Sequence, residues 1–163
     1  MRRYLLAWFI FLALISNGQG ISLKRVDSLI NSGDYALAES TIAALEQQAA
    51  ADLSARLLSK RAEILILQGK LNDAESALQR LSEGPAINNP FLLAEVKTNQ
   101  GFLYLNKARN DLALARLQEA VDLYRAADKS NTPEAARCLS TLSFVYLATG
   151  KYSQAEENGL VAL

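Results

Sequence analysis

The stretch GKYSQA at residues 150–155 has three earlier counterparts in the chain: GDYALA at 33–38, GKLNDA at 69–74 and ARNDLA at 108–113. Each begins with a small residue and has an alanine five positions later. A large side chain stands nine residues before each of these alanines: Leu29, Leu65, Tyr104 and Tyr146. Apolar or small residues follow each alanine at four and seven positions, which is helical spacing. The chain therefore contains four copies of one helix–turn–helix unit.

The residue types at the turns have a physical reason. Gly33, Gly69 and Gly150 supply the left-handed conformation that ends a helix, and the alanine lets the next helix approach its partner closely. Asn89-Pro90 and Thr132-Pro133 each place a capping side chain before a proline at the first helical position. The sequence predicts an all-α chain with helices near 22–32, 35–48, 52–68, 71–83, 90–107, 110–128, 133–149 and 152–163.

The four segments resemble tetratricopeptide repeats over residues 22–163, most specifically in Gly101-xx-Tyr104 and Leu142-xxx-Tyr146. The turn residues are 36, 39 and 42 positions apart, against the usual 34, so the resemblance is to extended repeats. It implies a right-handed superhelix (α-solenoid) of about four antiparallel helix hairpins that acts as a protein–protein interaction scaffold. An unrelated helical bundle with chance spacing is the alternative, and four recurrences in order argue against it.

The array is expected over residues 21–163, with repeats near 22–50, 52–84, 90–128 and 132–163. Terminal repeats ordinarily present a polar outer face, but the last helix of this chain would leave Leu160 and Leu163 uncovered. We therefore expect the array to continue beyond the given chain, or this edge to dock on another chain. A longer parent would resemble exported bacterial proteins in which the array is a periplasmic sensory or regulatory input region of a histidine-kinase, DNA-binding or caspase-like protease protein.

Residues 1–20 have the pattern of a signal peptide. Arg2 and Arg3 precede an unbroken apolar run from Tyr4 to Ile15, and small residues allow cleavage after Gly18 or Gly20. The run falls short of the ~20 residues of a membrane-spanning helix. We therefore expect an exported protein, periplasmic or extracellular, with no stable membrane span after cleavage; an uncleaved N-terminal anchor is the alternative.

Composition argues against catalysis, cofactors and nucleic acid. The chain has no histidine, which removes the usual general base and the commonest metal ligand. The single cysteine, Cys138, is expected in the core. Once Arg2 and Arg3 are set aside, 15 basic residues stand against 17 acidic ones, which offers no electrostatic footprint for nucleic acid. We expect a non-enzyme with no cofactor and no metal site, whose partner is a protein or peptide or another region of its parent chain.

In this family the first helix of each pair lines the concave, ligand-binding face. The resemblance places a candidate protein-binding groove there: Asn99, Phe102, Leu105, Asn106, Arg137, Thr141, Phe144 and Leu147. Two interpretations stay open: the apolar residues receive a hydrophobic peptide or helix while Asn99 bonds its backbone, or they are core between neighbouring repeats. The lysine that clamps a carboxylate tail in some relatives is replaced by Leu23, Ser59, Thr98 and Ser140, so that mode is not expected.

Overall fold

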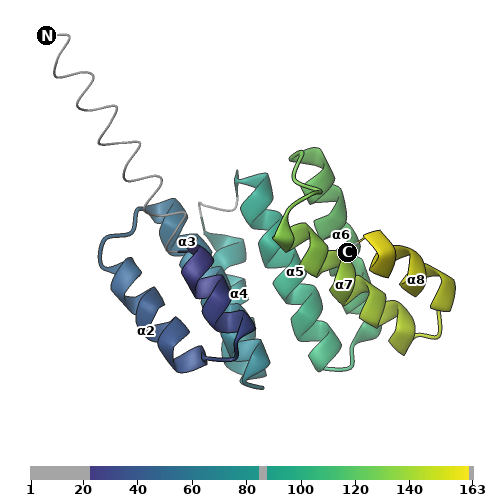
Figure 1. Cartoon of the computed structure of the whole chain (residues 1–163), viewed down its shortest axis with the longest axis horizontal. Coiled ribbons are helices and arrows are strands. Elements are labelled where there is room, and N and C mark those ends of the chain that lie inside the picture. The colour runs from purple at the N-terminus through teal and green to yellow at the C-terminus, as the bar shows by residue number, and fades with distance from the viewer. Residues whose placement is uncertain (1–22, 85–87, 162–163) are drawn as a thin grey trace, which may run out of the picture. The chain divides into compact units, whose positions relative to one another are not determined.

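The computed structural model describes residues 23–84 and 88–161, and the regular structure of this part of the chain is helical, with no strand. The helices belong to two compact units, residues 1–60 and 61–163 (Figure 1). The all-α prediction is confirmed, and the helix bounds lie within two residues of the expected ones wherever the structure describes them. The predicted signal peptide, residues 1–20, lies outside the described residues.

The first unit contains a helix over residues 23–31, then α2 (Tyr35–Glu46) and the beginning of α3 (Ala51–Leu67), which crosses into the second unit. Its core is aliphatic and includes Val26, Ile30 and Ile42. An ion pair joins Lys60 Nζ to an oxygen of Asp27 at 2.7 Å. The Asp34 carboxylate accepts a hydrogen bond from the Leu37 amide at 3.1 Å and so caps α2.

The second unit contains the end of α3, then α4 (Leu71–Glu83), α5 (Pro90–Asn106), α6 (Asn110–Ala126), α7 (Pro133–Ala148) and α8 (Tyr152–Val161). From α4 onward each helix packs against the next, and α5 also contacts α7 (Figure 1). Hairpins α5–α6 and α7–α8 therefore stack in order. Their shared core is built around α6 and α7 and includes Leu117, Tyr124, Leu142, Val145 and Tyr146.

The hairpin turns share one geometry in which the residue after the helix is left-handed. Gly69 and Gly150 both have φ +74°, and Ala108 has φ +54° at the equivalent place. The amide that follows each of them bonds a carbonyl five residues back, as in Arg109 to Tyr104 at 2.9 Å and Lys151 to Tyr146 at 2.8 Å. This closure is the Schellman motif, and glycine adopts it without steric cost.

Small residues set the spacing between paired helices. The alanine of each unit is buried: Ala38, Ala74, Ala113 and Ala155. Gly101 marks the tightest approach, because a Cβ added there would lie 2.5 Å from Cγ of Leu117 in α6. The predicted caps are also present: Asn89 accepts from the Phe91 amide at 3.0 Å, and Thr132 from the Ala135 amide at 3.3 Å.

Helix α6 ends two residues earlier than expected. The reason is Asp128, which adopts φ +53° and lets the Lys129 amide bond the Tyr124 carbonyl at 2.8 Å. Aspartate is among the few residues other than glycine that tolerate this conformation. Within the described residues, no helix has the length and apolar content that crossing a bilayer requires.

Candidate functional site

The eight residues expected in a binding groove all lie on α5 and α7, the first helices of the last two hairpins. These two helices contact one another in the second unit (Figure 1). The eight residues therefore lie on neighbouring helices, where some of their side chains are exposed to solvent and others are buried.

The apolar residues of this group differ in exposure. Phe144 is 64% exposed and Leu147 is 48% exposed, although both are large hydrophobic side chains in the middle and last turns of α7. Phe102 and Leu105, at the equivalent places in α5, are half-buried, and Leu105 packs against the core. Leu105 therefore packs in part as a core residue, whereas Phe144 and Leu147 are open to solvent.

The polar residues form a bridge between three helices, in which Asn99 and Glu63 are buried and the Arg137 side chain is partly exposed. Arg137 on α7 donates from Nη2 to Oδ1 of Asn99 on α5 at 3.0 Å, and its Nη1 lies 3.2 Å from Oε1 of Glu63 on α3. Asn99 is only 1% exposed. Its Oδ1 is therefore committed to Arg137, which revises the expectation that Asn99 bonds a ligand backbone.

The electrostatics of this bridge keep Arg137 charged. Burial alone lowers the pKa of Arg137, but the negative charge of Glu63 and weaker contributions from Tyr124 and Glu95 outweigh it, so the pKa lies above its ordinary value. A guanidinium neutralised by an internal carboxylate is a poor receptor for a second carboxylate. The bridge therefore joins α3, α5 and α7 to one another and leaves no free charge for an acidic ligand.

Thr141 and Asn106 bond within their own helices. The Thr141 hydroxyl is buried and donates to the carbonyl of Arg137 at 2.9 Å. The Asn106 side chain is exposed and donates from Nδ2 to the carbonyl of Phe102 at 2.9 Å. Of the two, only Asn106 reaches the surface beside the apolar residues.

Sequence reasoning missed the role of Glu63. It occupies, one repeat earlier, the position that Phe102 and Phe144 hold in α5 and α7. The equivalent position of the first repeat, Asp27, is acidic too, and a carboxylate at a position that packs between helices requires a cationic partner, which is the signal that would have identified Glu63. The partner, Arg137, lies two hairpins away in sequence and is revealed only by the fold.

Cys138 is a core residue, as expected. Its Sγ lies 3.6 Å from the carbonyl oxygen of Leu117, and burial raises its pKa to about 11. Tyr124 is buried nearby, with its ring edge-on to Phe91 at 5.8 Å between centroids, and burial raises its pKa well above the ordinary range. Its hydroxyl lies beside Thr98 and makes no hydrogen bond of standard geometry.

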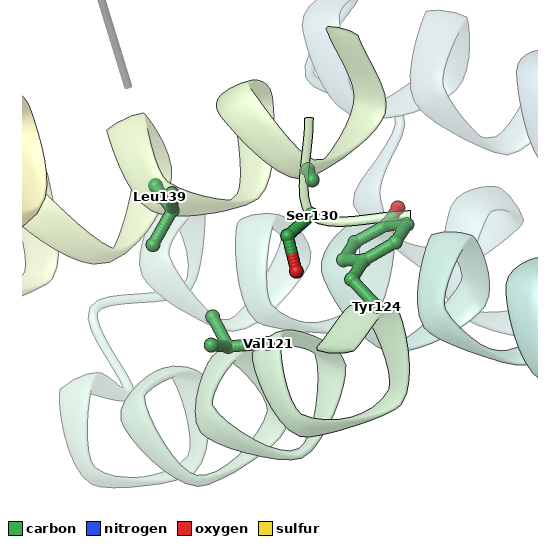
Figure 2. Close-up of a pocket in the computed structure, with 5 residues that line it drawn as sticks. Val121, Tyr124, Ser130 and Leu139 are labelled. Carbon is green, nitrogen blue, oxygen red and sulfur yellow. The ribbon is translucent and has the colours of Figure 1, made fainter. Parts of the chain in front are cut away.

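A hollow between α6 and α7 is too small to be a ligand site. Figure 2 shows Val121, Tyr124, Ser130 and Leu139 around it, and Ala135 completes the lining. Its volume of about 30 Å³ holds a water molecule or two, whereas small-molecule sites measure about 300–1,000 Å³. Among residues 23–84 and 88–161, no group of three acidic or cysteine side chains is placed to hold a metal ion.

The hairpins α5–α6 and α7–α8 stack on one another, and the first helix of the last hairpin, α7, exposes apolar side chains. This arrangement is that of an all-helical repeat protein. Residues 92–163, from α5 to α8, match the family model of the tetratricopeptide repeat. This segment is therefore assigned to the tetratricopeptide repeat family, whose members are helical solenoids that generally serve as non-catalytic scaffolds for protein–protein interaction. Comparisons with curated proteins and with solved structures give no match. Gly33 and Gly69 in the two earlier hairpins, outside the matched segment, adopt the same left-handed turn.

Proposed function

We propose that the chain is an exported scaffold that holds a protein ligand on the first-helix face of its last two hairpins. The observation that carries the proposal is the exposure of Phe144 and Leu147. Large apolar side chains exposed side by side are typical of interaction surfaces. They stand three residues apart on α7, so they present two anchors on one helical turn.

The surroundings of these anchors favour an apolar ligand over an acidic tail. Arg137, a cation of the same helix, is already paired with Glu63 at 3.2 Å. Thr98 and Ser59, which take the place of clamp lysines, are buried hydroxyl residues without charge. We therefore expect the ligand to be an amphipathic helix or an extended peptide that contributes apolar side chains, as in helix-in-groove recognition.

The test is capture of a ligand from an envelope extract by the immobilised wild-type protein. We expect a specific ligand that the Phe144→Ala and Leu147→Ala variants retain poorly, because truncating a central apolar anchor typically costs more than about 1–2 kcal/mol of binding. Tyr152→Ala is the matched control, since Tyr152 is also an exposed large residue but lies at the beginning of α8. Equal retention by all four proteins would remove the proposed face from consideration.

Export rests on the sequence of residues 1–20 and needs its own measurement. A charged pair, a twelve-residue apolar run and small residues at the boundary support a cleaved signal peptide. We expect the mature protein in the envelope fraction to begin at Gln19 or at Ile21, as read by N-terminal sequencing. A protein that keeps Met1 and fractionates with the membrane would instead be anchored by this segment.

A further inference from the structure

The ion pair between Arg137 and Glu63 joins two helices that are not neighbours in the order of the hairpins. Helices α3 and α7 are the first helices of the hairpins α3–α4 and α7–α8, and the hairpin α5–α6 lies between them in the chain. In a stack of helical repeats each repeat contacts only its immediate neighbours as a rule. The 3.2 Å approach of Arg137 Nη1 to Glu63 Oε1 is therefore a contact between second neighbours. It constrains α7 in a way that the packing of adjacent hairpins does not.

The guanidinium of Arg137 binds α3 and α5 at the same time. One terminal nitrogen faces Glu63, and the other, Nη2, donates to Oδ1 of Asn99 on α5 at 3.0 Å. The guanidinium is planar and its donors form a fork of fixed geometry, so the two contacts together define the direction from which α7 approaches. The apolar core around Leu117 and Leu142 lies on α5, α6, α7 and α8. Arg137 therefore ties α7 to a helix that this core does not include.

The repeat pattern alone does not supply this pair of charges. Equivalent positions are 39 residues apart between the second and third hairpins and 42 residues apart between the third and fourth. The equivalents of Glu63 in the later hairpins are Phe102 and Phe144. The equivalent of Arg137 in the preceding hairpin is Glu95. The ion pair is therefore a feature of this chain at these two positions and not of the repeat unit.

Two residues of the proposed ligand face are carried by the helices that Arg137 ties together. Phe144 lies seven residues after Arg137, two turns along the same face of α7. Phe102 lies three residues after Asn99, one turn along α5. Phe144 is largely exposed, so its own packing does little to fix its place. Its separation from Phe102 therefore depends on how α7 is set against α5 and α3.

We propose that Arg137 is a positioning residue for the ligand face, and that its ion pair with Glu63 is a strap that holds α7 at a fixed distance from α3 across α5. The strap sets the separation of Phe102 and Phe144, and with it the spacing of the apolar side chains that a ligand must present. This role in ligand binding rests on the proposed function, whereas the strap itself is a property of the free protein.

The spacing of α3 and α7 is measured in the free full chain by pulsed electron paramagnetic resonance between spin labels at Gln68→Cys and Ala148→Cys. Both residues are exposed, one directly after α3 and the other at the end of α7, and the native Cys138 is fully buried and stays unlabelled. Arg137→Gln is too short to span the contact, so we expect the mean distance to lengthen by about 2 Å or more. Arg137→Lys keeps the charge, and with it the ion pair, so it should retain the wild-type distance.

A double variant separates the strap from stability. Arg137→Gln alone leaves the carboxylate of Glu63 without its cation, which costs stability, whereas Glu63→Gln/Arg137→Gln removes both charges and should recover most of that loss. The double variant still lacks the strap, so we expect its distance to remain long. Glu119→Gln is the matched control, because it breaks an ion pair with Lys97, at 2.6 Å, that joins α5 and α6 within one hairpin. It should leave the distance unchanged.

The same variants test the position of the ligand anchors. The probe is the protein that the wild-type column captures from the envelope extract, used after purification. Arg137→Gln and the double variant should bind this probe about fivefold or more weakly, because mutations that shift a coupled element change affinity on this scale. Arg137→Lys should bind it as the wild type does.

Two results would overturn the proposal. An equal distance in the wild type, in Arg137→Gln and in the double variant would show that the pair does not hold α7. A longer distance with wild-type affinity would show that the pair does not position the anchors. Failure of the ligand face itself is recognised separately, because Phe144→Ala would then bind the probe as tightly as the wild type does while the distances still change.

Discussion

Gly101→Ala tests the packing that holds the last two hairpins together. The added Cβ would lie 2.5 Å from Cγ and 2.8 Å from Cδ2 of Leu117, whereas carbon atoms in contact are about 3.5–4.0 Å apart. Leu117 is fully buried and cannot turn aside, so α5 and α6 must separate by about 1 Å. Overpacking of this kind costs about 3 kcal/mol, and the gain in helix propensity returns about 1 kcal/mol, so the net loss of unfolding free energy is about 2 kcal/mol.

The assay is urea unfolding followed by circular dichroism, with a double-mutant cycle against Leu117→Ala. Removing the leucine costs about 2–5 kcal/mol by itself, but in that background Gly101→Ala no longer clashes and should stabilise by up to about 1 kcal/mol. The coupling between the two sites is then about 3 kcal/mol. Gly159→Ala is the matched control, since its Cβ makes only an ordinary contact with Ser143, at 3.4 Å, and should not destabilise. If Gly101→Ala changes the free energy of unfolding by the same amount in both backgrounds, Leu117 is not the source of the clash.

Two further predictions concern a turn and the core. Ala108→Gly should stabilise by about 0.5–1 kcal/mol, because Ala108 has φ +54° where glycine is unstrained; an unchanged or lower urea midpoint would contradict this. Burial raises the pKa of Cys138 from 9.0 to about 11, so the unfolded chain releases the thiol proton at a lower pH than the folded chain does. The contribution of this group to the free energy of unfolding is therefore complete below pH 9. It is lost as the pH rises through 11. Cys138→Ala should show a shallower fall over that range, and an identical fall would refute the assignment.

The helices were predictable because their signals are local. Gly69 and Gly150 mark helix ends, Asn89 and Thr132 mark helix starts, and the structure has these elements where the pattern places them. These residues act through the backbone of their own turn, so the sequence alone contains the information.

The character of the candidate site was less predictable because it depends on distant partners. The sequence pattern places Asn99 and Phe144 in the groove equally well. In the structure Asn99 is buried and hydrogen-bonded to Arg137, whereas Phe144 is exposed to solvent. The bridge from Arg137 to Glu63 joins residues of α7 and α3, and no local pattern specifies which acid a given arginine meets. Exposure and pairing are tertiary properties, so the sequence alone could not show which of the eight positions are open to solvent and which are buried.

The exposed face of α7 is tested most directly by a Phe144→Ala/Leu147→Ala double variant, whose affinity for the captured ligand depends on that face alone. Both side chains are exposed, so the free energy of unfolding measured in urea should stay within about 0.5 kcal/mol of wild type. Titration calorimetry should show a loss of at least about 2 kcal/mol in binding, roughly thirtyfold in Kd. Wild-type affinity in the double variant, with its stability intact, would contradict the assignment of this face as the ligand site.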